Sequence, residues 1–418
     1  MSNPSFSRSV SNRITKTLFI TQAFFGATQV AAFTVVPILS AQMADSESMA
    51  GVPMTVAFLA RSLAAYPIGL AMDRWGRRAG LSIGYLSSML ASITSFMAVL
   101  GHSFFGFCIG GALSGVARSS AEQARFIAAE IYPPDERALI ISRLVFAGTI
   151  SAIGGALLVP PSGTWISQFG LPPMSGPFAV GIGLGLTALI LTQIFIRPDP
   201  IILAQTFKSV NETHEDDLAS RSIRDVLRIP NVKYGIMAMV IGQFVMTMLM
   251  VITPLHMNHH NHGTWVISWV IMAHALGMFG VSGITGRLVG RFGQNAVIKM
   301  GVIILMASCI IAPISPQFIP LAFALFLLGL GWNFCFISGS SLLSNALAPH
   351  ERGRIQGINE MFVSFSAATA SLATGIFFDM GGLILPGIIG LGMSIVLGGY
   401  SLLYTRTMEK KETPVAAG

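Results

Sequence analysis

The sequence predicts an all-α polytopic membrane protein with 12 transmembrane helices arranged as two six-helix bundles. The 418 residues are 53% hydrophobic and 10% charged, with a mean hydropathy of +0.69. Apolar stretches of about 20 residues, each long enough to cross roughly 30 Å of hydrocarbon as a helix, recur from Leu18 to Leu403. In addition, two charged motifs each occur twice, once in each half of the chain.

The predicted spans are 18–40, 51–72, 79–99, 105–131, 139–159, 175–196, 234–256, 264–286, 296–313, 318–346, 354–377 and 384–404. They divide the chain into a cytoplasmic tail (1–17), an N-terminal six-helix half (18–196), a cytoplasmic linker (197–233), a C-terminal six-helix half (234–404) and a second cytoplasmic tail (405–418). The first tail is basic, and no small-residue cleavage site follows it, so we expect no cleaved leader. The linker is the only long polar stretch.

The basic residues indicate how the helices are oriented. Four of the 25 Lys and Arg residues lie within predicted spans, namely Arg61, Arg118, Arg125 and Arg143. The other 21 lie at or beyond span ends on one side, which the positive-inside rule makes cytoplasmic. We therefore expect a multi-pass protein of the cell membrane with both termini in the cytoplasm. This orientation accounts for the net charge of +7, so a nucleic-acid partner is not expected.

Two motifs reveal an internal repeat. The stretch GLAMDRWGRR (69–78) matches GRLVGRFGQN (286–295), with two glycines and an arginine aligned at an offset of 217 residues. The stretch YPPDERA (132–138) matches LAPHERG (347–353), with a proline, a glutamate and an arginine aligned at an offset of 215 residues. Each half thus has charged turns after its second and fourth helices. Two such halves in parallel orientation form the repeat pattern of a transporter.

At these residues the chain resembles the major facilitator superfamily (MFS) over essentially its whole length. The family's signature loop, Gly-x-x-x-Asp-Arg-x-Gly-Arg-Arg, is matched by Gly69, Asp73, Arg74, Gly76, Arg77 and Arg78. The second copy has Gly290 in place of Asp73. The resemblance implies the MFS fold and alternating access between the two halves. The segment GTISAIGGALLVPP (148–161) lacks the Gly-Pro pair of the family's drug/proton antiporters, which argues against that class.

The signature loop is a candidate conformational latch. Asp73, at a helix end, could accept hydrogen bonds from the free N–H groups of another helix's first turn. Gly69 would permit close helix approach and Gly76 a tight turn. Arg77 or Arg78 could pair with Glu130 at the end of the fourth helix, and in the family such contacts hold the outward-facing state. Alternatively, the arginines only anchor the topology, which would require neither Asp73 nor the glycines.

Ionisable residues inside the spans mark a candidate substrate or proton pathway. Such a residue costs roughly 2.5–3.5 kcal/mol at mid-bilayer, so it usually faces a cavity or a partner. Arg118, Glu122 and Arg125 share one face of the fourth helix by their i, i+4, i+7 spacing, where Glu122 could reach both arginines. Arg61 lies midway along the second helix. The cluster could bind an anionic solute, or it could neutralise itself and hold helices together.

Three further polar residues belong to this candidate pathway. Glu360 could carry a proton or pair with Arg352. His274, within the eighth helix, could carry a transport-linked proton. Asn333, with Gln243 and Trp332, could line a central cavity or form interhelical hydrogen bonds.

Four histidines lie at and after the end of the seventh span, on the predicted outer side, in PLHMNHHNH (254–262), namely His256, His259, His260 and His262. Imidazole is a ligand for borderline metals. A metal site, a pH-sensing or gating loop and a plain polar loop all fit this pattern. The cysteines Cys108, Cys309 and Cys335 lie in separate spans without metal or redox spacing.

The sequence therefore predicts a secondary active transporter of a small organic solute, coupled to protons and acting as a monomer in the lipid bilayer without a cofactor. A transition-metal transporter is the alternative suggested by the histidines, and a drug/proton antiporter comes after it. A nucleotide-binding loop and catalytic signatures are absent from the sequence, so neither direct ATP drive nor an enzyme is expected.

Overall fold

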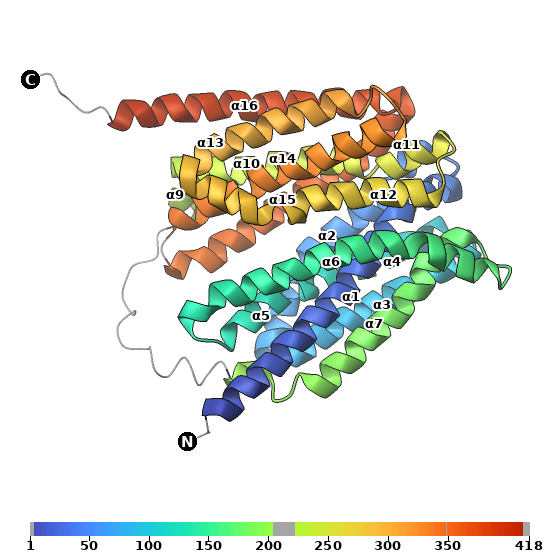
Figure 1. Ribbon diagram of the computed structural model, residues 1–418, viewed down its shortest axis with the longest axis horizontal. Coiled ribbons are helices and arrows are strands. Elements are labelled where there is room, and N and C mark those ends of the chain that lie inside the picture. The colour runs from blue at the N-terminus through green and yellow to red at the C-terminus, as the bar shows by residue number, and fades with distance from the viewer. Residues whose placement is uncertain (1–3, 204–221, 348, 413–418) are drawn as a thin grey trace, which may run out of the picture. The chain divides into compact units, whose positions relative to one another are not determined.

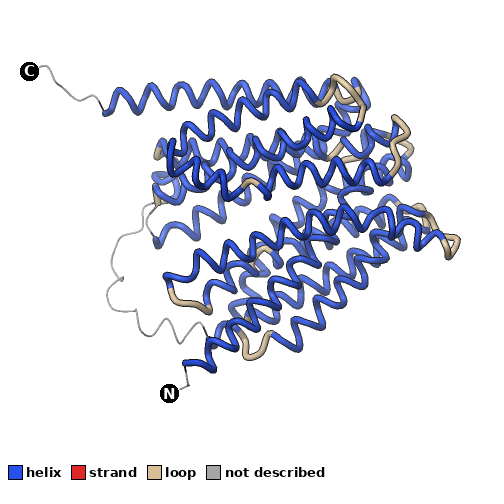
Figure 2. The backbone as a smooth tube through the Cα atoms, in the orientation of Figure 1, coloured by secondary structure: helices blue, strands red, loops and turns tan. Residues whose placement is uncertain are grey.

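The structure is a computed structural model that describes residues 4–203, 222–347 and 349–412. Throughout these ranges the chain forms helices joined by short loops, without strands (Figures 1 and 2). Ten of the described helices are long and apolar enough to cross a membrane, and Thr264–Gly280 is a shorter apolar helical segment. The predicted all-α polytopic fold is confirmed.

The chain divides into two compact units, Met1–Leu218 with Gly263–Ser268, and Ala219–His262 with Trp269–Gly418. The helices between the first residue described and residue 203 are α1 (Pro4–Ala44), η1 (Glu47–Met49), α2 (Val52–Trp75), α3 (Arg77–Leu100), α4 (Phe104–Ala121), α5 (Ala124–Glu130), α6 (Pro134–Ser167), η2 (Pro173–Ser175) and α7 (Gly176–Phe195). The predicted fourth span is thus divided into α4 and α5. At the division, the Gln123 N–H bonds to the carbonyl of Ser120, three residues back, which tightens the turn.

The helices that follow are α9 (Ile223–Arg228), α10 (Pro230–Met250), α11 (Thr253–His259), α12 (Thr264–Ala275), the π-helical η3 (Leu276–Gly280), α13 (Ser282–Ile311), α14 (Phe318–Asn345), α15 (Pro349–Gly381) and α16 (Ile384–Glu412). Two predicted boundaries change here. The loop expected after residue 256 is helical as far as His259, and the loop expected at 287–295 is a kink at Gly293 inside α13. Much of the predicted linker, residues 204–221, lies outside the described residues.

The same packing pattern recurs inside each unit. In the N-terminal unit, α1 packs on α6 and α7, and α3 packs on α4 and α7. In the C-terminal unit, α10 packs on α15 and α16, and α13 packs on α14 and α16. Each unit has buried apolar clusters of its own, which include Leu18 and Leu81 in the first and Met239 and Leu343 in the second. The internal repeat is therefore a repeat of helix packing.

The repeated signature loop is a repeated glycine turn. Gly76, between α2 and α3, has φ +92° and ψ 162°. Gly293, 217 residues later, has φ +80° and ψ 161°. Side chains rarely adopt this region of backbone space, so glycine is needed at both positions. Since Gly290 stands in the second copy, the turn itself does not depend on Asp73.

A second matched pair of glycines allows close helix contact. A Cβ atom at Gly115 of α4 would collide with the carbonyl oxygen of Ala57 on α2. A Cβ atom at Gly329 of α14 would collide with the carbonyl oxygen of His274 on α12. Small residues let membrane helices approach until their backbones touch. In both units, glycine thus allows the second and fourth helices of the repeat to touch.

We expect Gly329→Ala to lower the thermal stability of the purified protein. The added methyl group would meet backbone atoms, which cannot rotate away, and overpacking costs about 1–3 kcal/mol. The matched control is Gly392→Ala on α16, where a Cβ atom meets nothing within 4 Å. A midpoint temperature that is equal for the two variants would contradict the close-contact role of Gly329.

Candidate functional site

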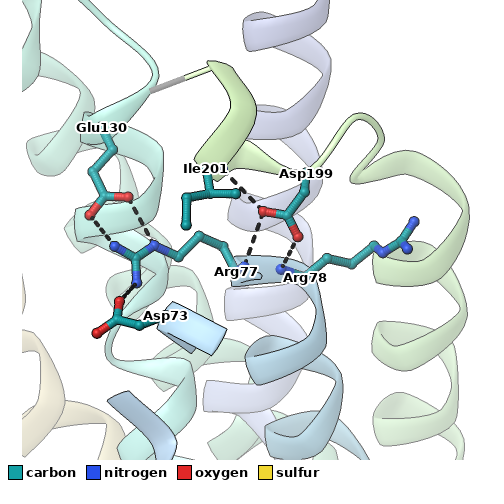
Figure 3. A network of polar contacts seen from close by, with 6 residues as sticks. All are labelled: Asp73, Arg77, Arg78, Glu130, Asp199 and Ile201. Atoms are coloured by element: carbon teal, nitrogen blue, oxygen red, sulfur yellow. Dashed lines mark hydrogen bonds and ion pairs between the residues drawn. The ribbon is translucent and has the colours of Figure 1, made fainter. Parts of the chain in front are cut away.

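The signature loop forms a charged network around Arg77, the first residue of α3 (Figure 3). Its Nε and Nη2 atoms donate to the two carboxylate oxygens of Glu130 at 3.1 Å each. Its Nη1 atom donates to Oδ1 of Asp73 at 2.8 Å. The side chains of Arg77, Glu130 and Asp73 are 20%, 36% and 69% exposed, so the two-pronged pair with Glu130 is the stronger contact. One guanidinium group thereby joins the end of α2, the start of α3 and the end of α5.

Asp199, which the sequence did not identify as a functional residue, caps the N-terminus of α3. Its Oδ1 accepts from the backbone N–H groups of Arg77 and Ile201, and its Oδ2 from that of Arg78, all at 3.0 Å (Figure 3). This is the type of contact that we predicted for Asp73. Among the described residues Asp73 instead binds a guanidinium group, because it lies one helical turn before Arg77. The signal in the sequence was an acid between two prolines directly after the sixth span.

The remaining residues of the loop have separate roles. A Cβ atom at Gly76 would collide with the carboxylate of Asp199, so this glycine provides both the turn and the space for the cap. Gly69 has no described atom within 4 Å of its Cβ position, so its predicted role in close helix approach stays a prediction. Arg74 is exposed, and the guanidinium group of Arg78 points away from the acids in Figure 3.

The second candidate site, the Glu122 cluster, consists of Glu122, Arg61 and Arg118. Oε1 of Glu122 accepts from Nε of Arg118 at 3.1 Å. Oε2 accepts from Nη2 and Nε of Arg61 at 2.7 and 3.0 Å. The side chains of Arg61, Glu122 and Arg118 are 14%, 30% and 43% exposed. Two guanidinium groups thus bond to one carboxylate, and Arg118 is the most exposed member of the cluster.

Arg125 does not make the predicted contact with Glu122. The turn between α4 and α5 interrupts the regular helix on which the i, i+7 spacing depended. The guanidinium carbon lies 4.8 Å from the ring centre of Phe126, and Nε is buried without a hydrogen-bond partner among the described residues. Arg125 still acts electrostatically on Glu122, so it adds a third positive charge to the surroundings of this carboxylate.

The C-terminal unit has uncharged side chains at the equivalent positions. Trp332 lies three residues after Gly329, as Arg118 lies three residues after Gly115. Its ring stacks on Phe336 with centroids 4.7 Å apart and planes inclined by 19°.

Two neighbours complete the surroundings of this indole. The ring of Phe279 stands edge-on to Trp332 at 6.4 Å and 73°. Nε1 of Trp332 donates to Oε1 of Gln243 at 2.9 Å, which is an interhelical hydrogen bond between α14 and α10. Because this bond satisfies the indole N–H, the ring of Trp332 offers an aromatic surface without a free donor.

Asn333 braces the π-helical segment η3. Its Nδ2 atom donates to the carbonyl oxygen of Met278 at 2.6 Å and to Oγ of Ser282 at 2.9 Å. Its Oδ1 atom accepts from Thr285 at 2.5 Å. Asn333 is 1% exposed, and its polar atoms are bonded inside the unit, so it supports this backbone segment. Its place in a transport pathway stays a prediction.

His274 is buried on α12 with one ring nitrogen unpaired. Its Nδ1 atom donates to the carbonyl oxygen of Leu325 at 2.9 Å, which fixes the tautomer because a carbonyl only accepts. Nε2 is buried and has no hydrogen-bond partner among the described residues. Its role as a proton carrier stays a prediction. Glu360 is partly buried on α15, and the side chain of Arg352, its predicted partner, lies outside the described residues.

The histidines after α10 are not arranged as a metal site. His256 and His259 belong to α11, and the ring centres of His256 and His260 are 4.5 Å apart. Nδ1 of His260 bonds to the carbonyl oxygen of His256, and Nε2 of His262 to that of Pro316, at 2.8 Å each. In the described part of the chain, no three His, Cys, Asp or Glu side chains gather around a possible metal position. The metal-transport alternative stays a prediction from the sequence.

Solved structures establish the fold by comparison. The chain is similar to a bacterial homolog of the human lysosomal transporter Spinster, in an inward-facing and occupied conformation, with a TM-score of 0.70, 15% identity and full coverage of both chains. It is also similar to the nucleoside transporter NupG, with a TM-score of 0.68 and 13% identity over 95% of this chain and 99% of that one.

Sequence comparisons identify the family. The chain is 31% identical over 406 residues to YdeG of Bacillus subtilis, an uncharacterized MFS-type transporter, covering 96% of this chain and 93% of that protein. It is 28% identical over 359 residues to the riboflavin transporter RfnT of Brucella anthropi, covering 86% and 87%. The family model of the Major Facilitator Superfamily matches residues 18–266 and 235–418. The chain therefore belongs to the Major Facilitator Superfamily and is a multi-pass membrane protein of this family of transporters.

Proposed function

We propose that the protein is a secondary transporter of a small organic solute that carries an anionic group, and that Arg118 binds this group. The observation that carries the proposal is the guanidinium group of Arg118, which stays 43% exposed although it is bonded to Glu122. Arg61 and Arg118 both donate to this carboxylate, and Arg125 adds a third positive charge to its surroundings. Arg118 is the most exposed of the bonded members and can therefore reach a solute.

The same cluster supports coupling to protons. Glu122 and the anionic group of a solute compete for the same guanidinium hydrogens. Protonation of Glu122 removes its charge and releases Arg61 and Arg118, and a bound anion then supplies the counter-charge that these arginines need in hydrocarbon. A proton and the anion consequently bind together, which makes the transporter a symporter.

The aromatic group around Trp332 supports a solute that also has a flat ring. Aromatic rings gain about 0.5–1.5 kcal/mol from stacking beyond the area they bury. Trp332, Phe336 and Phe279 are each partly exposed and can offer such a surface within the C-terminal unit. A relative that covers most of this chain is a riboflavin transporter, and riboflavin contains a flat fused ring.

We further propose that the Arg77 network is the conformational latch of the N-terminal unit, at the cytoplasmic end of its helices. Arg77 is held twice, through its side chain by Glu130 and through its backbone by Asp199. Separation of α3 from α5 would break both prongs of the ion pair at once. The network therefore favours one arrangement of these helix ends.

Replacing Arg118 by Gln should weaken binding of an anionic solute at least about tenfold, because hydrogen bonds to charged groups contribute about 1.5–3 kcal/mol. The measurement is a thermal-shift screen of the purified protein against aromatic carboxylates and phosphates, followed by titration of any stabilising compound. Arg406→Gln on α16 is the control, since it removes the same charge from an exposed position. Equal affinities in the two variants would exclude Arg118 as the anion-binding residue.

Glu122→Gln should abolish proton-driven accumulation while leaving exchange of the solute across the membrane. The amide cannot release a proton, and it no longer competes as an anion for the two arginines. Proteoliposomes loaded with unlabelled solute measure exchange, and an inward proton gradient measures accumulation. Accumulation by this variant at the rate of the parent would show that Glu122 is not the coupling residue.

For the latch, Arg77→Gln should slow transport severalfold without lowering the amount of protein inserted in the membrane. Arg74→Gln is a matched control from the same loop, because Arg74 is exposed and outside the network. If Arg77 is a latch, only Arg77→Gln should slow transport, whereas two topology anchors should respond alike. If the two variants transport at the same rate, Arg77 serves only as an anchor.

A further inference from the structure

A groove between α1 and α7 lies within the N-terminal unit. It is open and has a volume of about 860 Å³. Residues from the first part of α1 and the last part of α7 line it. Its lining combines basic and apolar side chains, mainly Arg8, Arg13, Lys16, Ile20, Leu191 and Phe195. None of these residues takes part in the Arg77 network or the Glu122 cluster.

The groove carries an uncompensated positive charge. No carboxylate of the described residues lines it. Arg8 is paired at 3.1 Å with Glu136, which offsets one of the three charges. Arg13 donates through Nη2 to the backbone carbonyl oxygen of Arg197, a bond that positions the guanidinium group without neutralising it. Lys16 adds a second positive charge to this lining, which contains no described carboxylate.

The apolar part of the groove adjoins these charges. Lys16 and Ile20 are i, i+4 neighbours on α1, so they lie on one face of the helix. Ile20 is 43% exposed and Phe195 is 41% exposed. Large apolar side chains that stay exposed on a membrane-spanning helix face lipid chains. A soluble anion would leave this surface uncovered, whereas an amphiphile would cover both parts of the groove.

We propose that this groove binds an anionic phospholipid, with its phosphate on Arg13 and Lys16 and an acyl chain along Ile20, Leu191 and Phe195. Basic pockets between transmembrane helices on the cytoplasmic side bind anionic lipid headgroups. The predicted orientation places this end of α1 on that side. The combination of two cations that lack a described carboxylate partner with an adjoining apolar wall selects an anionic lipid over both a zwitterionic lipid and a free anion.

The test is a thermal-shift titration of the full-length protein, purified in neutral detergent, with phosphatidylglycerol. Phosphatidylcholine and inorganic phosphate are titrated in parallel and should have little effect. The double variant Arg13→Gln/Lys16→Gln should bind phosphatidylglycerol about 25-fold more weakly, or about fivefold for each charge removed. The control Arg287→Gln/Arg406→Gln removes two charges from exposed positions outside the groove and should titrate like the parent.

Three outcomes would overturn the proposal: equal stabilisation by the two lipids, stabilisation by inorganic phosphate alone, or an unchanged titration in the double variant. Replacing Arg13 also removes its hydrogen bond to the carbonyl oxygen of Arg197, just after α7, and this loss alone can change stability. A second measurement therefore uses the unaltered protein. Native mass spectrometry after incubation with equimolar phosphatidylglycerol and phosphatidylcholine should show retained phosphatidylglycerol. Equal retention of both lipids would equally count against the groove as an anionic-lipid site.

Discussion

A guanidinium group within the hydrocarbon region of a bilayer requires a counter-charge, because its insertion costs roughly 2.5–3.5 kcal/mol. In this protein Glu122 meets that need for Arg61, which is only 14% exposed. The ion pair connects α2 with α4 close to Gly115, where the backbones of the two helices touch. Close packing and charge pairing thus stabilise the same helix contact. Arg118 shares Glu122 with Arg61 but remains 43% exposed, which is why we propose it as the residue that binds the solute.

The end of a helix also has polar groups that need partners. At the start of α3 the free N–H groups need acceptors, and Asp199 supplies them from the segment that follows α7. The side chain of Arg77 is then directed to Glu130 and Asp73. Gly76 allows the Asp199 cap and the Arg77 ion pairs to form together, since any side chain at this position would occupy the space of the Asp199 carboxylate.

The sequence predicted those features that depend on local pattern. Apolar length gave the spans, and the repeated motifs located the turns at Gly76 and Gly293. The pair between Arg77 and Glu130 followed from the signature loop and the charge at the end of the fourth span. Asp199 was missed because its contact with Arg77 joins residues 122 positions apart. The spacing of residues within one helix cannot predict a contact over this distance in the sequence. The division between α4 and α5 was missed as well, because 105–131 reads as one apolar stretch; this division separates Arg125 from the cluster.

The two copies of the repeat separate what the fold requires from what the chemistry requires. Both copies keep the glycine with positive φ and the glycine at the close helix contact, so these positions specify the architecture. They differ where side chains carry charge: Gly290 stands at the position of Asp73, and Trp332 at that of Arg118. A fold that only needed two equal bundles would not need this difference. The charge and the exposed guanidinium group of the N-terminal unit are therefore not required by the packing that the two copies share, and the proposed solute site and latch both rest on these residues.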